Sequence, residues 1–306
     1  MADRLHDVIV IGAGAAGVST AIECSDIQLD VLLFESADRV GGQIEEVPHT
    51  MRNVVTSADG NDKLLAALAQ HASTLGDRLR LGEPIHSLDL ATGRVATKDG
   101  SHRAKSVLIA TGSRRRELRI FPDGSFGGDV TYLIEPQFQR FAGRPMVVVG
   151  GGDSAALDAL ALADAGSQVA LVHRSPELSS RHDIVARLRS SDRITELAGW
   201  DVDELVGGDQ LRSVKVSNPT TGERREIEAG GIDLKLGREK RVELVEGQVE
   251  LGPHGGITVD ASLRTSNPST FAAGDVTEGA YERVATATGE GSLAAHSILN
   301  YLQSSE

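Results

Sequence analysis

The sequence has 306 residues, of which 40% are hydrophobic, and its formal net charge is −13 with a pI near 5.2. This length suits two or three domains with real cores, and the apolar fraction argues against disorder. The acidic balance disfavours a nucleic-acid binder and an anionic membrane surface as a partner. No apolar run is long enough to span a bilayer. A hydrophobic strand (Val8 to Ile11) begins so early that we expect no signal peptide and predict a cytoplasmic protein.

Short β-branched runs alternate with alanine-rich helical patterns along the chain, which indicates a parallel α/β architecture. In the first part we expect a strand, a tight turn and a helix over 7–25, a strand over 30–36, an amphipathic helix over 64–76 and a strand over 106–113. The same order restarts with a strand, a glycine loop and a helix over 145–166 and a strand over 168–175. Short strands and polar turns follow over 193–237, then a strand over 270–276 and a helix over 292–302. The chain therefore contains an internal duplication of a nucleotide-binding unit.

The first glycine loop lies directly between a strand and a helix, and Gly12, Gly14 and Gly17 form the pattern G-x-G-x-x-G. The first glycine permits a tight turn, the second lets the backbone approach a diphosphate, and the third allows close helix–strand packing. The phosphates would face the amides of the helix N-terminus. Glu35 closes the next strand, where an acid binds the ribose hydroxyls. Together these residues predict a dinucleotide site.

The second glycine loop has the form G-x-G-x-x-A, with Gly150, Gly152 and Ala155. The strand after it ends in His173 and Arg174 and carries no acid, and Arg181 lies further on. Arginines accept a 2′-phosphate, whereas an acid at this place selects NAD. The residues therefore favour NADP, and a Rossmann-like unit without a bound nicotinamide stays open as the alternative.

Three further motifs follow in a fixed order: Gly-Gly-Gln at 41–43, Ala-Thr-Gly at 110–112, and a strand that ends in Gly274 and Asp275. With the two glycine loops, they make the chain resemble, over nearly its whole length, the low-molecular-weight thioredoxin reductases of the pyridine nucleotide–disulfide oxidoreductase superfamily. The resemblance implies an α/β protein with two Rossmann-like three-layer domains and a homodimer. The implied FAD-binding domain comprises residues 1–115 and 241–306, and the NAD(P)H-binding domain, residues 116–240, is inserted in it.

The resemblance also implies the cofactors, which are FAD and either NADPH or NADH. The residues expected to bind FAD are Gly12, Gly14, Ala15, Ala16, Gly17, Glu35, Ser36, Gly41, Gly42, Gln43, Asn53, Ala110, Thr111, Gly112, Gly274, Asp275, Arg283, Val284 and Ala285. Those expected to bind the nicotinamide nucleotide are Gly150, Gly152, Asp153, Ser154, Ala155, His173, Arg174 and Arg181.

The chain departs from the reductases at the place of their C-x-x-C dithiol, which falls on Leu133 and Pro136. Cys24 is the single cysteine, and we expect it to be a buried core residue of another domain. Disulfide exchange needs an attacking thiolate and a resolving thiol, so ordinary thioredoxin reduction has no chemical basis here. The linker over 132–143 is similar to that of the thioredoxin-reductase-type ferredoxin/flavodoxin–NADP reductases, which lack the dithiol.

Two more departures change charge. The NADPH-specific pattern H-R-R-x-x-x-R has serines, Ser175 and Ser179, at two of its three arginine positions, and the family's arginine–glutamine pair near the flavin falls on Glu282 and Arg283. A basic stretch, Arg114 to Arg116 with Arg119, follows the Ala-Thr-Gly turn. It either docks an acidic electron carrier or forms a hinge turn whose arginines pair with nearby carboxylates.

The leading hypothesis is an FAD-dependent NAD(P)H oxidoreductase that passes electrons from the flavin directly to ferredoxin, flavodoxin or a small molecule. The alternative is a flavin-binding protein that has lost this reductase activity and serves as a sensor or partner subunit, or whose flavin another protein reduces. Hydride transfer needs no acid or base side chain, so we name no catalytic residue. The nine histidines show no metal-binding spacing, so we expect no metal site. Tyr132 and Trp200 are expected to be packing residues.

Overall fold

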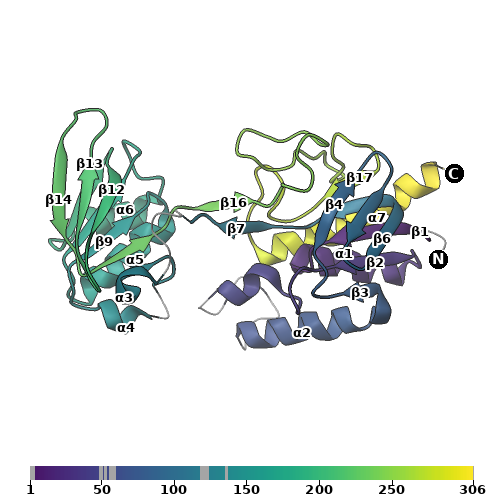
Figure 1. Cartoon of the computed structure of the whole chain (residues 1–306), viewed down its shortest axis with the longest axis horizontal. Helices are drawn as coiled ribbons and strands as arrows, with labels where there is room; N and C mark the ends of the chain where they lie inside the picture. Colours follow the sequence, from purple (N-terminus) through teal and green to yellow (C-terminus); the bar gives the residue numbers. More distant parts are fainter. Residues whose placement is uncertain are drawn as a thin grey trace. The chain divides into compact units, whose positions relative to one another are not determined.

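The computed structural model describes residues 4–47, 51, 54, 60–117, 124–134 and 137–305. The chain forms two compact units: Met1–Arg114 with Glu239–Glu306 make unit 1, and Arg115–Arg238 make unit 2 (Figure 1). The chain leaves unit 1 through β7 (Ser113–Arg115) and returns through β16 (Arg238–Lys240), and these two strands pair. The predicted α/β class, with one Rossmann-like unit inserted in another, is confirmed.

Unit 1 is built around a mixed sheet in the order β3-β2-β1-β6-β5-β4, with β17 beside β6. Its strands are β1 (Leu5–Ile11), β2 (Val31–Phe34), β3 (Leu79–Arg80), β4 (Ile85–Asp89), β5 (Arg94–Thr97), β6 (Gly100–Ile109) and β17 (Thr270–Ala272). Its helices are α1 (Ala15–Asp26), α2 (Asn61–Ser73) and α7 (Val284–Ser304), with the short 3₁₀ turns η1 (Gly42–Glu46) and η3 (Gly76–Arg78).

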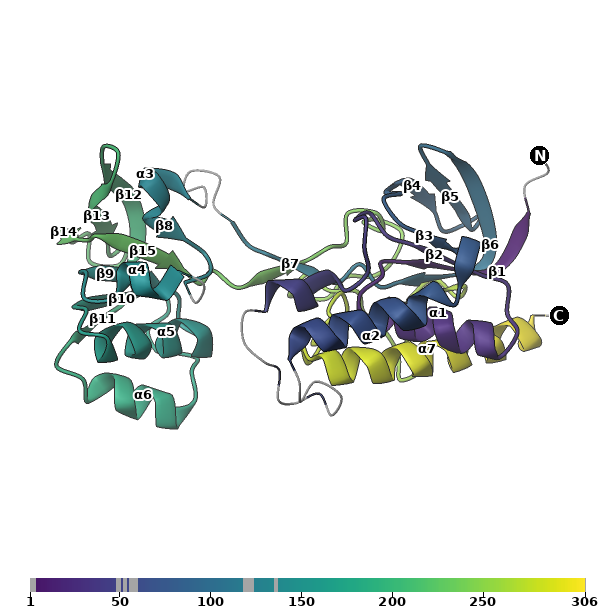
Figure 2. The same ribbon diagram turned by 90° about the horizontal axis from the view of Figure 1, so that it is seen from below.

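The central strands of unit 1 are parallel and are covered on both faces. In β1, Val8, Ile9 and Val10 are fully buried, as the continuous apolar run predicts for a parallel strand between two layers. In Figure 2, α1, α2 and α7 lie together on one face of this sheet. Apolar residues of the segment after β16, among them Val242 and Ile257, cover the other face. The sheet thus forms the middle layer of three.

Helix α7 begins at Val284, eight residues before the helix that the sequence predicts, which we placed at 292–302. Its first half contains Gly289 and Gly291, and glycine is a poor helix former. Gly291 nevertheless packs against α1: a Cβ at this position would overlap the carbonyl oxygen of Ala16. The hydroxyl of Thr20 in α1 also donates to the carbonyl of Gly291 at 2.9 Å. Close helix packing therefore explains the glycine there and offsets its low helix propensity.

Unit 2 has a parallel sheet in the order β11-β10-β9-β15-β8 and an antiparallel sheet β12-β13-β14. The strands are β8 (Val130–Thr131), β9 (Met146–Val149), β10 (Val169–His173), β11 (Ile194–Ala198), β12 (Asp201–Gly207), β13 (Leu211–Ser217), β14 (Arg224–Glu228) and β15 (Gly231–Leu234). The helices are α3 (Ser125–Gly128), α4 (Phe138–Phe141), α5 (Asp153–Asp164) and α6 (His182–Arg189).

The parallel sheet of unit 2 also lies between two layers, with α5 and α6 on one face and β12 to β14 on the other (Figure 2). The short strands and polar turns predicted over 193–237 include a hairpin, in which Asn-Pro-Thr-Thr-Gly at 218–222 forms the turn between β13 and β14. The side-chain oxygen of Asn218 accepts the amides of Thr220 and Thr221 at 2.9 and 3.0 Å. Trp200 and Tyr132 are buried in the core between the sheets, as predicted for packing residues.

No helix in the described part of the chain combines the length and the apolar character that crossing a membrane requires.

Candidate dinucleotide-binding sites

The first glycine loop joins β1 to α1, and its three glycines, Gly12, Gly14 and Gly17, lie at the turn between them. Gly12 has φ +103°, and a Cβ there would overlap the carbonyl oxygen of Ala110. A Cβ on Gly17 would overlap the carbonyl oxygen of Gly12. A Cβ on Gly14 would meet nothing within 4 Å, and the first turn of α1, with Ala15 and Ala16, carries no acid. The loop therefore leaves open space for an anion against the helix N-terminus.

Glu35 follows the end of β2 and is held in a fixed orientation by its own neighbourhood. One carboxylate oxygen accepts the amide of Ala13 in the glycine loop at 2.7 Å. The other accepts the hydroxyl of Ser36 at 3.0 Å and the amide of Ala37 at 2.9 Å. The carboxylate thus stands beside the glycine loop, where it can bind the hydroxyls of a ribose, as the motif predicts.

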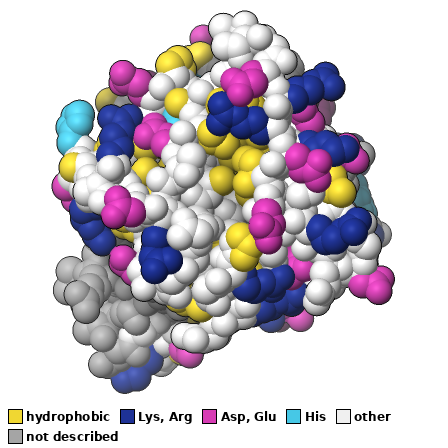
Figure 3. Space-filling view, turned by 90° about the vertical axis from the view of Figure 1, so that its left-hand side faces the viewer, with side chains coloured by type: hydrophobic (Ala, Val, Ile, Leu, Met, Phe, Trp, Pro, Cys, Tyr) yellow, Lys and Arg dark blue, Asp and Glu magenta, His cyan; other side chains and the backbone are white. Residues whose placement is uncertain are grey.

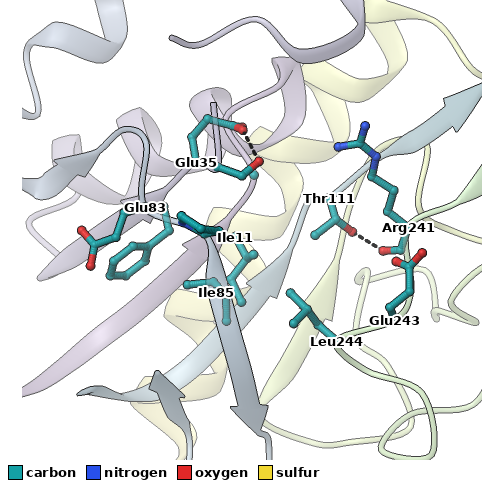
Figure 4. A pocket seen from close by; sticks show the side chains of 12 residues that line it. Ile11, Glu35, Glu83, Ile85, Thr111, Arg241, Glu243 and Leu244 are labelled. Atoms are coloured by element: carbon teal, nitrogen blue, oxygen red, sulfur yellow. Dashed lines mark hydrogen bonds between the residues drawn. The ribbon is translucent and has the colours of Figure 1, made fainter. Parts of the chain in front are cut away.

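A pocket opens in unit 1 beside these residues, with about 610 Å³ of open space (Figure 4). Its lining residues are Ile11, Gly12, Phe34, Glu35, Ser36, Glu83, Pro84, Ile85, Thr111, Arg241, Glu243 and Leu244. Apolar side chains such as Ile85 and Leu244 line one part, and the carboxylate of Glu35 stands at another. This combination fits the adenosine and diphosphate part of a dinucleotide, which needs apolar walls for a base and polar groups for sugar and phosphate.

The motifs Gly-Gly-Gln, Ala-Thr-Gly and Gly-Asp, far apart in the sequence, converge around the N-terminus of α1. The amide of Gln43 donates to the carboxylate of Asp275 at 2.9 Å, and the Gln43 oxygen accepts the hydroxyl of Ser113 at 3.3 Å. Gly42 faces Gly14, because a Cβ on Gly42 would come within 3.4 Å of the Gly14 Cα. A Cβ on Gly112 would come within 3.1 Å of the Gln43 amide nitrogen. Gly41, Ala110, Thr111 and Gly274 belong to the same turns.

Glu282 and Arg283 lie directly before α7, where the sequence predicts a change of charge near the flavin. Glu282 does not leave an unpaired negative charge there, because Lys240 Nζ lies 2.7 Å from its carboxylate. Arg283 caps α7 before Val284 and Ala285, and its guanidinium lies 4.9 Å from the centre of the exposed Tyr281 ring. Asn53, which was also predicted to bind the cofactor, lies outside the described residues.

The second glycine loop joins β9 to α5 in unit 2. Gly150 has φ +143°, and a Cβ there would come within 2.5 Å of the Lys235 carbonyl oxygen. Gly152 leaves open space apart from the Ser179 hydroxyl at 3.9 Å, and Ser154 and Ala155 follow in the first turn of α5. The hydroxyl and the amide of Ser179 both donate to the carbonyl of Gly151, at 3.1 and 2.8 Å. The segment after β10 is thereby fastened to the glycine loop.

The polar residues predicted to surround the second nucleotide occupy different environments. His173 is 3% exposed, and its Nε2 lies 3.3 Å from Glu196, so its side chain points into the protein. Arg174 is exposed. Arg181 lies within 3.3 Å of Asp183 and 4.0 Å of Asp153. These two arginines are the exposed cations at the end of β10, which agrees with the preference for a 2′-phosphate that the sequence predicts.

Asp153 opens α5 and fixes the same segment from the other side. Its carboxylate accepts the hydroxyl of Ser180 at 2.7 Å and the amide of Arg181 at 2.9 Å. The Ser180 hydrogen bond, followed by the Arg181 amide, lowers the pKa of Asp153. Asp153 therefore orients the segment that carries Arg181 and is itself occupied by these contacts.

Three buried charged residues lie beside the second glycine loop: Asp158, Asp233 and Lys235. We call them the lysine cluster. Lys235 Nζ lies 2.8 Å from Asp158 and 3.4 Å from Asp233, and also 3.4 Å from the carbonyl oxygen of Tyr132. The side chains of Lys235, Asp158 and Asp233 are 9%, 11% and 0% exposed, respectively. Burial raises the pKa of Asp233 well above its usual value, against the opposing effect of Lys235.

The linker before β9 is held on unit 2 at Leu133, one of the two residues that the sequence predicts at the place of the dithiol. The hydroxyl of Thr131 donates to the carbonyl of Leu133 and accepts the Leu133 amide, both at 3.0 Å. Ile134 is 1% exposed, and Pro136 lies outside the described residues. Cys24 is a fully buried residue of α1 in unit 1, as predicted. Burial, followed by the nearby carboxylates of Glu23 and Asp7, raises the pKa of the Cys24 thiol to about 12.

The basic stretch after the Ala-Thr-Gly turn is partly neutralised. Arg114 contacts Glu239 at 2.5 Å and Glu243 at 2.6 Å, which agrees with the hinge-turn interpretation for this residue. Arg119 lies outside the described residues. On the end of unit 2 that faces the viewer in Figure 3, basic and acidic side chains are interspersed, with apolar side chains between them. That face therefore offers a carrier no patch of one sign.

Several residues of the first site carry no motif and were missed by reasoning from the sequence. They are the pocket-lining residues Pro84, Ile85, Arg241, Glu243 and Leu244. Arg241 to Leu244 belong to the segment after β16, which only the tertiary fold brings to the Ala-Thr-Gly turn. The lysine cluster was missed as well, because its charges come from separate elements.

Two glycine loops, each between a parallel strand and a helix, define a protein with two Rossmann-like dinucleotide-binding units. The family model described as "Pyridine nucleotide-disulphide oxidoreductase" matches residues 6–291. A thioredoxin reductase of Mycolicibacterium smegmatis is 30% identical, with 95% of this chain and 94% of the relative covered. A 34.2 kDa protein in a rubredoxin operon of Clostridium pasteurianum is 28% identical, with 98% of each chain covered.

Solved structures give the same result. The thioredoxin reductase of Lactococcus lactis superposes with a TM-score of 0.80 at 28% identity, with 98% of this chain and 99% of the other covered. The chain belongs to the pyridine nucleotide-disulphide oxidoreductase family. It is accordingly an FAD-dependent NAD(P)H oxidoreductase, and FAD and NAD(P)H are its cofactors.

Proposed function

We propose that this oxidoreductase passes electrons from its flavin directly to an acceptor that is not a dithiol. FAD is assigned to unit 1 and the nicotinamide nucleotide to unit 2. The flavin supplies the chemistry, since it can take a hydride from the nicotinamide and release the electrons to a second partner. The chain's residues bind and orient the two nucleotides, and no side chain is needed as an acid or a base.

The observation that carries this proposal is the state of the single thiol. Cys24 is fully buried in α1, and its pKa is raised to about 12, so it has almost no thiolate at neutral pH. We infer that Leu133 replaces one cysteine of the family's dithiol, and its backbone is hydrogen-bonded to the hydroxyl of Thr131. Thiol–disulfide exchange requires a reactive thiolate and a second thiol, and the chain has neither.

The choice between NADPH and NADH rests on the end of β10. Arg174 and Arg181 are exposed cations there, and the carboxylate on the neighbouring strand, Glu196, is turned inward to His173 and Arg189. Because the strand itself carries no acid for a free ribose hydroxyl, the arrangement favours the 2′-phosphate of NADPH. We propose NADPH as the preferred donor.

An anaerobic titration tests the proposal. Stepwise NADPH should bleach the flavin absorbance, and the reduced protein should then reduce a one-electron dye without any thiol partner. Bleaching only with NADH would leave the oxidoreductase in place and contradict the donor preference. Bleaching with neither nucleotide would contradict the proposed reductase.

That last outcome would favour the second candidate, a flavoprotein that has lost nicotinamide-dependent activity. The observation in its favour is the engagement of Arg181 with Asp153 and Asp183, which competes with a phosphate for the same guanidinium. In that case another protein would reduce the flavin. Rapid NADPH-dependent dye reduction would exclude this candidate.

We propose a small electron-transfer protein as the acceptor and a homodimer as the assembly. Ferredoxin or flavodoxin suits the dithiol-free linker, and rubredoxin stands beside them because one relative is encoded in a rubredoxin operon. Each can be tested as an acceptor in the same NADPH assay. The predicted homodimer should give twice the mass of the chain in analytical ultracentrifugation.

A further inference from the structure

Among the residues of the first site that no motif predicts, Arg241 is the basic one. It lines the pocket beside Gly12 and Thr111, and in Figure 4 its side chain extends along the wall on the opposite side from Glu35. Its guanidinium makes no hydrogen bond or ion pair with any other side chain that the structure describes. Arg241 is exposed, so its guanidinium is available to an anionic ligand beside the pocket.

The backbone of Arg241 is fixed to the nucleotide-binding turn. The Arg241 amide donates to the carbonyl of Gly112 at 3.0 Å, and the hydroxyl of Thr111 donates to the Arg241 carbonyl at 2.6 Å. Both contacts come from the Ala-Thr-Gly motif, which packs against the first glycine loop through Ala110 and Gly12. The guanidinium therefore starts from a backbone position that the cofactor motif itself determines.

The carboxylate of Glu243 could compete with an anionic ligand for the guanidinium of Arg241, but Arg114 holds it. Glu243 lines the same pocket, two residues after Arg241. Its carboxylate lies 2.6 Å from Arg114 Nη2, and Arg114 Nε contacts Glu239 at 2.5 Å. Arg114 thus holds the carboxylates of Glu239 and Glu243, which leaves Arg241 available for an incoming anion.

We propose that Arg241 binds the diphosphate of the dinucleotide in unit 1, and that Arg114 keeps Glu243 from competing for its guanidinium. The inference rests on the proposed assignment of FAD to this unit. A guanidinium can give a phosphate two parallel hydrogen bonds, and this contact adds to the amides at the N-terminus of α1. Arg114 in this account is a positioning residue, because it acts on the ligand only through Glu243 and Arg241.

The test measures FAD release from the purified holoprotein, followed by the rise in flavin fluorescence on dilution. We expect Arg241→Gln to raise the FAD dissociation constant by about tenfold or more, the loss typical of a charge-assisted hydrogen bond. Arg241→Lys should retain part of the affinity. Arg94→Gln is the matched control, because Arg94 is an exposed arginine of β5 in unit 1 that bonds to Ser101 and does not line the pocket.

Competition by adenine compounds separates a phosphate contact from a general disturbance of the fold. ADP and adenosine are used to displace FAD from each holoprotein. Arg241→Gln should weaken displacement by ADP and leave displacement by adenosine within about twofold, since adenosine has no phosphate. An equal loss for both probes, or an FAD affinity equal to that of the parent, would overturn the inference.

The role of Arg114 gives a second and independent arm. Arg114→Gln should weaken FAD binding because it frees Glu243 to pair with Arg241, and Glu243→Gln added to it should restore the affinity. If the double variant binds as weakly as Arg114→Gln, the Glu243 step is wrong. A parent protein that binds no FAD would contradict the proposed function, whereas a parent that binds FAD beside an unaffected Arg241→Gln would contradict this inference alone.

Discussion

Replacing Lys235 with methionine should destabilise unit 2 by about 3–5 kcal/mol, the cost of removing one partner from a buried ion pair. Lys235 Nζ is 2.8 Å from Asp158 and 3.4 Å from Asp233, and the two carboxylates are 11% and 0% exposed. Without the ammonium group, the fully buried carboxylate of Asp233 loses its cationic partner. Methionine has a similar length, so the lost packing is small beside the lost charge.

The loss of stability in Lys235→Met should grow as the pH rises. Burial raises the pKa of Asp233 in the folded protein, so the stability that this group contributes is complete below its unfolded value of 3.8. That contribution is lost as the pH rises through the raised folded value. Lys235 opposes the shift, so its removal raises the folded pKa of Asp233 further and extends the loss to higher pH. At mildly acidic pH, where the carboxyls take up protons more readily, the variant should approach the parent.

Hydrogen–deuterium exchange measured on peptides of β9, β15 and α5 reports unit 2 separately from unit 1. A loss of this size predicts exchange roughly a hundredfold to several thousandfold faster for amides that exchange only when the unit opens. Lys215→Met is the matched control, because Lys215 pairs with Glu204 at 2.8 Å on the surface of the same unit. That exposed pair should be worth about 1 kcal/mol or less. Equal exchange in the two variants, or a loss that does not depend on pH, would refute the account of the cluster.

Three further predictions concern the two sites and the thiol. Cys24 should react with a thiol reagent such as DTNB only after unfolding in urea, and fast reaction of the native protein would contradict its burial and raised pKa. Gly17→Ala should purify with little or no FAD by absorbance, because its Cβ would overlap the Gly12 carbonyl oxygen; a full complement of FAD would contradict this geometry. Arg174→Ala and Arg181→Ala should each raise KM for NADPH by about tenfold with little change for NADH; equal effects on both donors would contradict their proposed role.

Much of the first site could be predicted because its motifs act locally. The glycines at 12, 14 and 17 are fixed by the turn between β1 and α1, and Glu35 is fixed by the end of the next strand. The partnership of Gln43 with Asp275 also follows from motif order, although no local rule predicts their hydrogen bond. Arg241 could not be predicted, because its place in the pocket depends on where a segment without a motif returns to unit 1.

The lysine cluster shows a different limit of the sequence. The residues Ile-Asp-Leu-Lys alternate apolar and charged side chains, which is typical of a strand with one face in water. The four residues of β15, Gly231–Leu234, are instead all buried. Asp158 of α5 supplies a second carboxylate, and Lys235 lies between the two acids. Charges that neutralise one another in the fold cannot be recognised from a pattern along one strand. The same reason explains why Glu282, read from the sequence as a change of charge, is paired with Lys240.

The most direct test of direct flavin-to-acceptor transfer is a count of the electrons that the protein takes up in an anaerobic titration with dithionite. A flavin without a redox-active dithiol accepts two electrons, so full reduction should require two electrons per bound FAD in both the parent and Cys24→Ala. A dithiol in communication with the flavin adds two more. Uptake of four electrons per FAD, or an uptake that falls when Cys24 is replaced, would contradict the account.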